Sequence, residues 1–279
     1  MKQADLHVHT TASDGTYTPR QVVELAGRLG LSALGICDHD TTEGVDEAQR
    51  ASADGSVEIV PGVEISAYLP GAEVHVLGYY TRSSDPEFCS LLNRLRQSRY
   101  ERLHEMVKRL VELGVDIVPE HVLRIAGGSA PGRPHVARTL VETGHVRDVS
   151  EAFSQYLDVG KPAYVERYKL SPRQAICAVR KAGGVPVLAH PGLSGVIDSI
   201  SGLKHAGLMG IEVYHPAHDG ATERLLCELA LRYSLLITGG SDCHGCAYAH
   251  LGELGQVRLN YHHVEELKSA ADSVRSAGA

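Results

Sequence analysis

The sequence contains no tryptophan, two phenylalanines and six cysteines among its 279 residues. So few cysteines in a chain of this length do not form a disulfide scaffold, which favours a reducing compartment and a cytoplasmic location. No apolar run approaches the ~20 residues that span a bilayer, so we expect no membrane partner. The N-terminus lacks a basic segment followed by an apolar stretch, so the sequence predicts no secretory signal.

The composition indicates a globular chain with a sizeable core, because 43% of the residues are hydrophobic and 22% are charged. The formal net charge of −7 is unevenly distributed, since residues 86–184 are net positive and the remainder is net negative. A basic segment beside an acidic body suits an anion next to bound cations, although chance surface variation explains the charges equally well. The 16 histidines are more than core packing requires.

Seven short apolar runs flanked by turn residues predict buried strands. These runs cover residues 4–9, 32–37, 57–62, 73–78, 185–190, 209–214 and 235–240. Helical patterns lie between several of them, and the first has Thr18 as its N-cap, Pro19 at its first position and Gly30 at its end. Alternating strands and helices favour an α/β fold of parallel βαβ units in a barrel, with an open doubly wound sheet as the alternative.

Residues 86–184 interrupt this alternation with helical patterns alone. A long amphipathic helix is predicted over residues 85–114, and shorter helices over 134–143, 148–157 and 171–182. The apolar face of the long helix is formed by Leu92, Leu95, Leu103, Met106, Leu110 and Leu113. We therefore expect a helical insertion, residues 86–184, between the fourth and fifth strands of a domain formed by residues 1–85 and 185–279.

Two histidines lie one residue apart in the first predicted strand. Alternate residues of a strand share a face, so Asp5, His7 and His9 point one way while Leu6 and Val8 point the other. A single inward histidine is more often a hydrogen-bonded core residue than a ligand. Two neighbouring imidazoles on one face favour a metal site, because neutral imidazole is a common metal ligand.

The other predicted strands carry similar side chains at or near their carboxyl ends, where barrels hold their chemistry. These residues are Asp38, His39, Asp40, Glu64, His75, His190, Asp242 and His244. Burying so many polar groups independently is improbable, so we expect them to meet. Histidine and carboxylate ligands without thiolate suit Mn²⁺, Zn²⁺ or Fe²⁺ in a hydrolytic cluster.

The ordered motifs DLHVHT with Asp14, CDHDT, GVEIS, HVLGY, LAHPG and GSDCHG resemble those of the polymerase-and-histidinol-phosphatase (PHP) family of metal-dependent phosphoesterases. The resemblance covers most of the chain and implies a distorted (β/α)7 barrel with three divalent ions, of which Mn²⁺ is preferred and Fe²⁺ or Zn²⁺ are alternatives. By resemblance, the first ion is held by His7, His9, Glu64 and Asp242. Glu64 bridges to a second ion with His75 and His190, and Asp14, His39 and His244 hold the third.

The insertion resembles the helical cap of a PHP subgroup that acts on nucleoside 3′,5′-bisphosphates and on 5′ ends of short RNA. The matching segments are GRPHVARTLVETG (132–144) and GKPAYV (160–165). By this likeness Arg133, His135 and Lys161 contact substrate phosphate, which suits their charge and hydrogen-bonding capacity. Each also has an ordinary interpretation, as a solvated surface cation or, for His135, as a local helix-start residue.

Several carboxylates and histidines are candidates for supporting roles. Asp5, Asp38 and Asp40 are expected to orient metal-bound imidazoles, although Asp40 suits a solvent-facing position equally well. His215 and His218 follow the sixth predicted strand and are candidates to border the substrate.

The resemblance implies hydrolysis of a phosphomonoester by a hydroxide that bridges two metal ions, with no side-chain nucleophile. The expected substrate is the 3′-phosphate of nucleoside 3′,5′-bisphosphates, with short 5′-phosphorylated RNA as a second substrate. The alternatives are a histidinol-phosphate phosphatase, a 5′–3′ exonuclease alone and a non-catalytic metal-binding module. Negative charge and the absence of an aromatic stacking platform argue against stable binding of duplex or long single-stranded nucleic acid.

Overall fold

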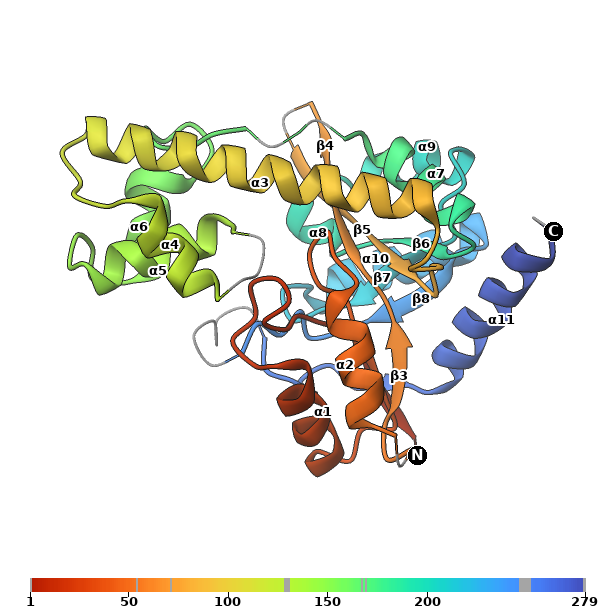
Figure 1. The fold of residues 1–279 in the computed structure, drawn as a ribbon. Helices are drawn as coiled ribbons and strands as arrows, with labels where there is room; N and C mark the ends of the chain where they lie inside the picture. Colours follow the sequence, from red (N-terminus) through yellow and green to blue (C-terminus); the bar gives the residue numbers. More distant parts are fainter. Residues whose placement is uncertain are drawn as a thin grey trace.

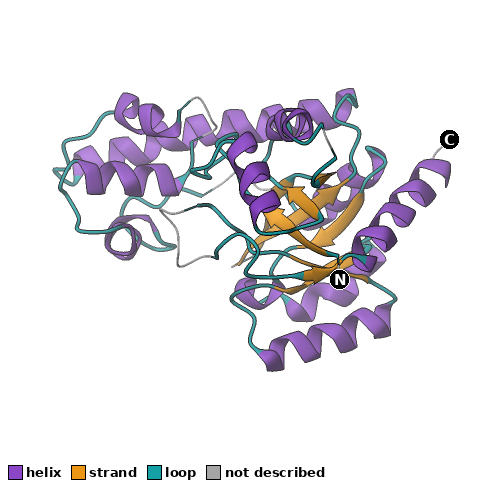
Figure 2. Cartoon of the chain, turned by 90° about the horizontal axis from the view of Figure 1, so that it is seen from below, coloured by secondary structure: helices purple, strands orange, loops and turns teal. Residues whose placement is uncertain are grey.

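Strands lie at the centre of the computed structural model and helices surround them (Figure 1, Figure 2). The structure describes residues 2–53, 55–70, 72–127, 131–166, 168, 170–245 and 252–277. The strands are β1 (Gln3–Val8), β2 (Ala33–Ile36), β3 (Glu58–Pro61), β4 (Glu64–Leu69), β5 (Ala72–Tyr79), β6 (Val185–Leu188), β7 (Gly210–Tyr214), β8 (Leu236–Gly239) and β9 (Leu259–Asn260).

The strands form two sheets, ordered β3-β2-β1-β9 and β4-β5-β6-β7-β8. Pairing is parallel within β1–β2–β3 and within β6–β7–β8, as the alternation of strands and helices predicts. The pairs β4–β5, β5–β6 and β1–β9 are antiparallel, which the expected parallel βαβ units did not include. The short connection between β4 and β5 makes this pair antiparallel, because a tight turn joins only antiparallel strands. The reversed direction of β5 also makes its pairing with β6 antiparallel.

Isolated parallel bridges connect the two sheets at two places, at the end of β1 and just after β2. Val8 pairs with Cys243, and His39 pairs with Glu64. Both bridges lie immediately beside candidate site residues, so the carboxyl ends of β1, β2 and β8 and the start of β4 meet at one place. Within the described residues, however, regular pairing does not continue round into a single closed sheet.

Some of the helices begin at a residue whose side chain caps the first turn, whereas others have no side-chain cap. The helices are α1 (Pro19–Arg28), α2 (Glu43–Ala51), α3 (Pro86–Glu112), α4 (Pro119–Ala126), α5 (Arg133–Glu142), α6 (Val149–Ala152) with the π-helix η1 (Phe153–Leu157), α7 (Pro172–Lys181), α8 (Pro191–Ser194), the 3₁₀ helix η2 (Ile197–Ser199), α9 (Ile200–His205), α10 (Gly220–Tyr233) and α11 (His262–Ala277). At α1, Thr18 and Gln21 form the reciprocal capping box, and Gly30 follows the helix with a φ of 72°.

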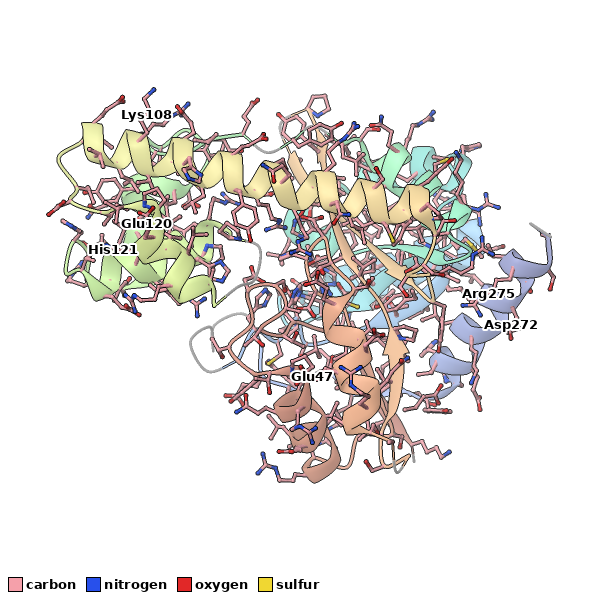
Figure 3. The ribbon with its side chains drawn as sticks, viewed as in Figure 1. Glu47, Lys108, Glu120, His121, Asp272 and Arg275 are labelled. Atoms are coloured by element: carbon pink, nitrogen blue, oxygen red, sulfur yellow. The ribbon has the colours of Figure 1, made fainter. Side chains whose placement is uncertain are left out.

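The long helix α3 belongs to two hydrophobic cores. Its first half, with Phe88, Leu92 and Leu95, packs in the cluster that joins the β4–β8 sheet to α7, α9 and α10. Its second half packs with α4, α5 and α6 in a separate cluster within residues 103–163, which we call the helical lobe. In Figure 1 the lobe lies to one side of the strands, and Figure 3 places Lys108, Glu120 and His121 on it.

The expected helix of residues 85–114 is confirmed as α3, and its apolar face is buried except at Leu113, which is 48% exposed. Leu113 is the C-cap of the helix, so the 3.6-residue pattern no longer governs its direction. The shorter predicted helices are confirmed as α5, α6 with η1, and α7, whereas α4 was not predicted.

All seven predicted strands are present as β1, β2, β3, β5, β6, β7 and β8. The strands β4 and β9 were not predicted. Because β4 begins three residues after β3 ends, the two read in the sequence as one strand followed by a loop. No helix within the described ranges is long and apolar enough to cross a membrane.

Candidate metal centre

Nine residues expected to meet come together where the two sheets adjoin. His7 lies within β1, Glu64 begins β4 and His75 lies within β5, while the other six follow β1, β2, β6 or β8. These six are His9, Asp14, His39, His190, Asp242 and His244. All nine side chains are buried except that of His75, which is half-buried. Because β5 runs antiparallel, its amino-terminal half lies at the carboxyl ends of its neighbours, which brings His75 to the same place.

The carboxylate of Glu64 lies at the centre of this group. Imidazole nitrogens from five histidines lie within 3.6 Å of its two oxygens. The shortest distances are 2.8 Å from Oε1 to Nδ1 of His75 and 2.9 Å from Oε2 to Nδ1 of His39. The remaining three are His7, His9 and His190. Burial raises the pKa of Glu64, but these histidines outweigh it and hold that pKa well below its usual value.

Two further carboxylates, those of Asp242 and Asp14, extend the group. Asp242 Oδ1 lies 3.1 Å from His9 Nε2 and 3.5 Å from His7 Nε2. Asp14 lies 3.4 Å from His244 Nε2 and 3.8 Å from His39 Nε2. Three overlapping groups therefore offer ligand atoms within 4.8 Å of one another. They are His9 with Asp14, His39 and His244; His7 with His9 and Asp242; and His39 with Glu64 and His75.

Several polar atoms at the centre are buried without a hydrogen-bond partner. They are Asp14 Oδ1, His39 Nδ1, Glu64 Oε2, both ring nitrogens of His75, His190 Nδ1 and Asp242 Oδ1. His39 Nδ1 and Glu64 Oε2 are 2.9 Å apart, yet neither makes a hydrogen bond. The relative orientation of the two groups is therefore not that of a hydrogen bond. Unpaired buried polar atoms are costly, and a cation among them would satisfy these lone pairs, so the donor set fits divalent metal ions.

The histidines at the centre have strongly altered proton affinities. Burial lowers the pKa of His9, but the neighbouring carboxylates of Asp242 and Glu64 outweigh it and raise the pKa to about 10. Burial lowers the pKa of His39 to about 4, despite the opposing charges of Glu64 and Asp14. One imidazole of the group therefore binds its proton more tightly than an isolated histidine, and another binds it less tightly. This is expected where carboxylates and imidazoles lie close together in a buried site.

Glu212, on β7, is a site residue that the sequence analysis missed. Its side chain is fully buried; Oε1 lies 3.0 Å from Nδ1 of His7, and Oε2 accepts the backbone N–H of His190 at 2.8 Å. A carboxylate on Nδ1 fixes the ring orientation and leaves Nε2 to face the centre. The signal was available, because Glu212 alternates with the buried Ile211 and Val213 as His7 alternates with Leu6 and Val8.

The three aspartates expected to orient imidazoles contact other groups. Asp5 accepts the backbone N–H groups of Ser241 and Gly255 at 2.9 Å each. Asp38 accepts the backbone N–H and the hydroxyl of Thr10, both at 2.8 Å, and the hydroxyl of Ser13 at 2.7 Å. These two carboxylates therefore hold the loops that follow β1 and β8, and within the described part of the chain neither bonds to an imidazole.

Asp40 is buried and does not face solvent. Its Oδ1 accepts the backbone N–H of Ser66 at 2.9 Å, and its Oδ2 lies 2.6 Å from Nη2 of Arg99 on α3. Asp40 has a φ of 55°, a conformation that costs free energy for a residue with a side chain. The contacts with Ser66 and Arg99 hold the residue beside His39 in this conformation.

His215 and His218 differ in their relation to the centre. His215 is buried, accepts the backbone N–H of Ala217 on Nδ1, and directs Nε2 to within 3.6 Å of Asp242 Oδ2. Both ring nitrogens of His218 are bonded to backbone, at Val213 and Gly192. His215 therefore borders the centre, whereas His218 supports the loop after β7.

The lobe residues expected to contact phosphate lie in three different environments. His135 on α5 is buried and accepts the backbone N–H of Gly132 on Nδ1, which leaves the proton on Nε2. Burial lowers the pKa of His135 to about 4, although the charge of Asp14 opposes this. Arg133 pairs with Glu73 of β5 at 2.7 Å and lies over the ring of Tyr164. Lys161 is exposed in the turn after η1.

The PHP domain family model matches residues 5–166 of this chain. A 5′-3′ exoribonuclease of Haemophilus influenzae is 33% identical over 90% of this chain and 94% of its own length. A phosphoribosyl 1,2-cyclic phosphate 1,2-diphosphodiesterase of Eggerthella lenta is 35% identical over 86% and 94%. A 3′,5′-nucleoside bisphosphate phosphatase of Chromobacterium violaceum is 32% identical over 88% of both chains.

A solved structure, described as that of a metal-dependent phosphoesterase from Bifidobacterium adolescentis, is also similar. It matches with a TM-score of 0.90 and 34% identity, over 96% of both chains. The match extends along nearly the whole chain, so it includes the helical lobe as well as the two sheets. This chain therefore belongs to the PHP domain family and, like these relatives, is a hydrolase of phosphoric esters.

Proposed function

We propose that this enzyme removes the 3′-phosphate from nucleoside 3′,5′-bisphosphates and also acts on short 5′-phosphorylated RNA. The observation that carries the proposal is the Glu64 carboxylate, which faces five imidazoles while neighbouring lone pairs remain unpaired. The match to the bisphosphate phosphatase of C. violaceum supports this substrate class.

We assign the nine residues to three divalent ions, and the three overlapping groups of ligand atoms support this number. His7, His9, Glu64 and Asp242 hold the first, Glu64, His75 and His190 the second, and Asp14, His39 and His244 the third. Bound ions would supply the positive charge that acidifies water and stabilises the phosphoryl oxygens. Mn²⁺ is preferred, with Fe²⁺ or Zn²⁺ as alternatives, because the ligand atoms are nitrogen and oxygen without thiolate.

The chain's own residues orient these ligands and bind the substrate. Glu212 fixes the ring of His7, while Asp5 and Asp38 hold the loops that carry other ligands. His135 presents an N–H on Nε2, which suits an anionic phosphate oxygen. We assign Arg133 and Lys161 to phosphate as well, the first pre-oriented by Glu73 and the second from the surface of the lobe.

The arrangement that we propose is a distorted (β/α)7 barrel with residues 86–184 as its cap and residues 1–85 and 185–279 as the metal-binding domain. The bridges at Val8 and at His39 support the barrel, and the separate core of the helical lobe supports the cap. The described cysteines are all free, which supports a reducing, cytoplasmic location.

A second candidate is hydrolysis of phosphodiesters. Two relatives of nearly full length carry diesterase names, the exoribonuclease of H. influenzae and the cyclic phosphate diphosphodiesterase of E. lenta. A diester has one negative charge fewer than a terminal phosphomonoester, so cationic lobe residues contribute less to its binding. We therefore rank the bisphosphate first.

The test is a phosphate-release panel with the Mn²⁺-loaded enzyme. We expect kcat/KM for adenosine 3′,5′-bisphosphate to exceed that for AMP and for histidinol phosphate. Equal rates, or a preference for histidinol phosphate, would contradict the assignment. A denaturing gel of 5′-phosphorylated oligoribonucleotides tests the diesterase candidate in parallel, because stepwise shortening without release from the bisphosphate would favour it.

A further inference from the structure

The last helix, α11, carries a group of metal-ligating side chains that is separate from the metal centre. His262 and His263 are its first two residues, and Glu266 follows about one turn later. Residues three and four apart on a helix are neighbours, so the carboxylate of Glu266 can reach both imidazoles. In Figure 1, α11 lies on the opposite side of the strands from the helical lobe. We call these three residues the α11 cluster.

The three side chains of the α11 cluster offer ligand atoms that lie within 4.8 Å of one another. Oε2 of Glu266 is 3.2 Å from Nδ1 of His263, and the centroids of the two imidazole rings are 3.7 Å apart. Zinc binds nitrogen and oxygen at about 2.0–2.2 Å, so two ligand atoms of one ion are at most about 4.4 Å apart. The side chains of His262 and Glu266 are exposed, so small rotations bring all three ligand atoms within this limit.

The backbone that carries the α11 cluster is held in place by the rest of the molecule. Val264 and Leu267, on the inward face of α11, are buried in the core that also contains residues of β1. Oδ1 of Asn260 accepts the backbone N–H of His262 at 3.1 Å, which fixes the start of the helix. Binding an ion would therefore require side-chain rotation but no ordering of the backbone, and such preorganisation favours affinity.

The crowding of the two imidazoles favours their neutral, ligating forms, because two protonated rings at this distance would repel each other. Burial and the adjacent His262 lower the pKa of His263, although the carboxylate of Glu266 opposes this. A neutral imidazole keeps a lone pair on one of its ring nitrogens in either tautomer. His263 is therefore available as a metal ligand at neutral pH.

The donor atoms of the α11 cluster select the class of ion. Two imidazoles and one carboxylate, without thiolate, suit Zn²⁺, Ni²⁺ or Cu²⁺, whereas Ca²⁺ and Mg²⁺ require more oxygen ligands. Partial positive charge at a helix start disfavours a cation, but the carboxylates of Glu265 and Glu266 offset it. Three protein ligands leave coordination positions open, and solvent water can fill them because the cluster lies at the surface.

We propose that His262, His263 and Glu266 form a second metal site, which binds one Zn²⁺, Ni²⁺ or Cu²⁺ ion at the surface of the molecule. Mn²⁺ binds such donors more weakly than these three ions, so Mn²⁺-loaded enzyme has little metal at the α11 cluster. A bound ion stabilises the folded state, because the three ligands come together only when α11 is formed. The site is independent of the proposed function, since it shares no residue with the metal centre or the helical lobe.

The test is equilibrium dialysis of the protein against Zn²⁺, followed by metal analysis, in the wild type and in the double variant His262→Gln/His263→Gln. The variant should bind one ion fewer per chain. With Mn²⁺ it should hydrolyse p-nitrophenyl phosphate, a substrate with one phosphate, as fast as the wild type does. Glu266→Gln keeps both imidazoles but removes the charged ligand, so it should weaken Zn²⁺ binding at this site about tenfold or more. Unchanged Zn²⁺ affinity in Glu266→Gln would contradict the proposed ligand set.

The matched control is the double variant His104→Gln/His205→Gln, which also removes two exposed histidines from helices. In each of these, Nδ1 lies close to a backbone carbonyl oxygen, at 2.8 Å from Tyr100 and 2.7 Å from Ser201. The control should bind as many ions as the wild type. The inference is overturned if the α11 double variant loses no ion, or if the control loses one as well. It is also overturned if the α11 double variant loses phosphatase activity together with the ion, because the lost ion then belongs to the metal centre.

Discussion

Glu64 and Glu212 are both buried carboxylates facing histidines, but their positions give them different roles. Glu64 contacts imidazoles on both of its oxygens and has an unpaired oxygen at the centre of the ligand group. Glu212 lies behind His7 and uses its second oxygen on the backbone of His190. The first therefore suits direct contact with an ion, and the second suits orientation of a ligand ring.

Replacing Glu212 with glutamine tests this distinction. The amide keeps the shape and can still accept from the N–H of His190, but it loses the charge that stabilises the Nδ1–H tautomer of His7. We expect metal affinity or kcat to fall about 10- to 100-fold while the fold is retained. Metal titration followed by mass spectrometry, together with circular dichroism, measures both, and unchanged metal affinity and activity would contradict the assignment.

Arg133 provides a second test at a single residue. It is held by Glu73 and lies over the ring of Tyr164, so its guanidinium is pre-oriented at the edge of the lobe. Arg133→Ala should lower kcat/KM for adenosine 3′,5′-bisphosphate about tenfold or more, and that for p-nitrophenyl phosphate much less.

The matched control is Arg124→Ala, which removes another lobe arginine in an ion pair, with Glu142, but at an exposed position. It should leave both kcat/KM values unchanged. If Arg133→Ala and Arg124→Ala behave alike, Arg133 has no part in substrate binding.

The sequence alone was sufficient to predict most of the residues that converge here, but not their supporting contacts. His7 and His9 were recognisable because histidine is unusual on the inward face of a buried strand. Arg99 was not recognisable, because an arginine on a long amphipathic helix normally lies on its solvent face. Its burial depends on Asp40 and Ser66, which lie far from it in the sequence.

At the scale of helices and strands, the sequence predicted those features that depend on residues close together in the chain. Pro19 and the capping box of α1 lie within a few residues of one another, so the start of that helix was recognisable. The strand β4 was missed because its separation from β3 depends on a change of sheet, with Val60 and Glu64 pairing to different neighbours. Strand direction likewise depends on tertiary pairing, which the apolar pattern does not encode.

The capping box of α1 gives a prediction about stability alone. Thr18→Ala removes the hydroxyl that accepts the N–H of Gln21. We expect the free energy of unfolding to fall by about 1 kcal/mol, since N-cap threonines contribute about this much. Thermal melting and the phosphate-release assay check this, and a large loss of activity in a normally folded variant would contradict it, because Thr18 lies outside the ligand set.

At the scale of the whole molecule, the stability of the fold, the protonation of His9 and the binding of divalent ions depend on one another. The pKa of His9 is raised to about 10 from an ordinary value of 6.5, so protonated His9 stabilises the metal-free fold. This contribution is complete below pH 6.5 and is lost as the pH rises through about 10. Divalent ions compete with the same proton, so their apparent affinity should increase with pH across this range.

Calorimetry at about pH 6.5 and about pH 8.5 tests this coupling. Mn²⁺ should bind more weakly at the lower pH, and its binding should release protons. Repeating the titration in buffers of different ionisation enthalpy measures the number of protons released. Binding that is independent of pH and releases no protons would contradict the coupling.

The most direct test of the account is the metal content of the purified protein measured alongside its phosphatase activity. We predict up to three divalent ions per chain at the metal centre, with activity lost on chelation and restored by Mn²⁺, and with Glu64→Gln impaired in both respects. A protein that binds no divalent ion, or one that hydrolyses phosphate esters equally well after chelation, would contradict it.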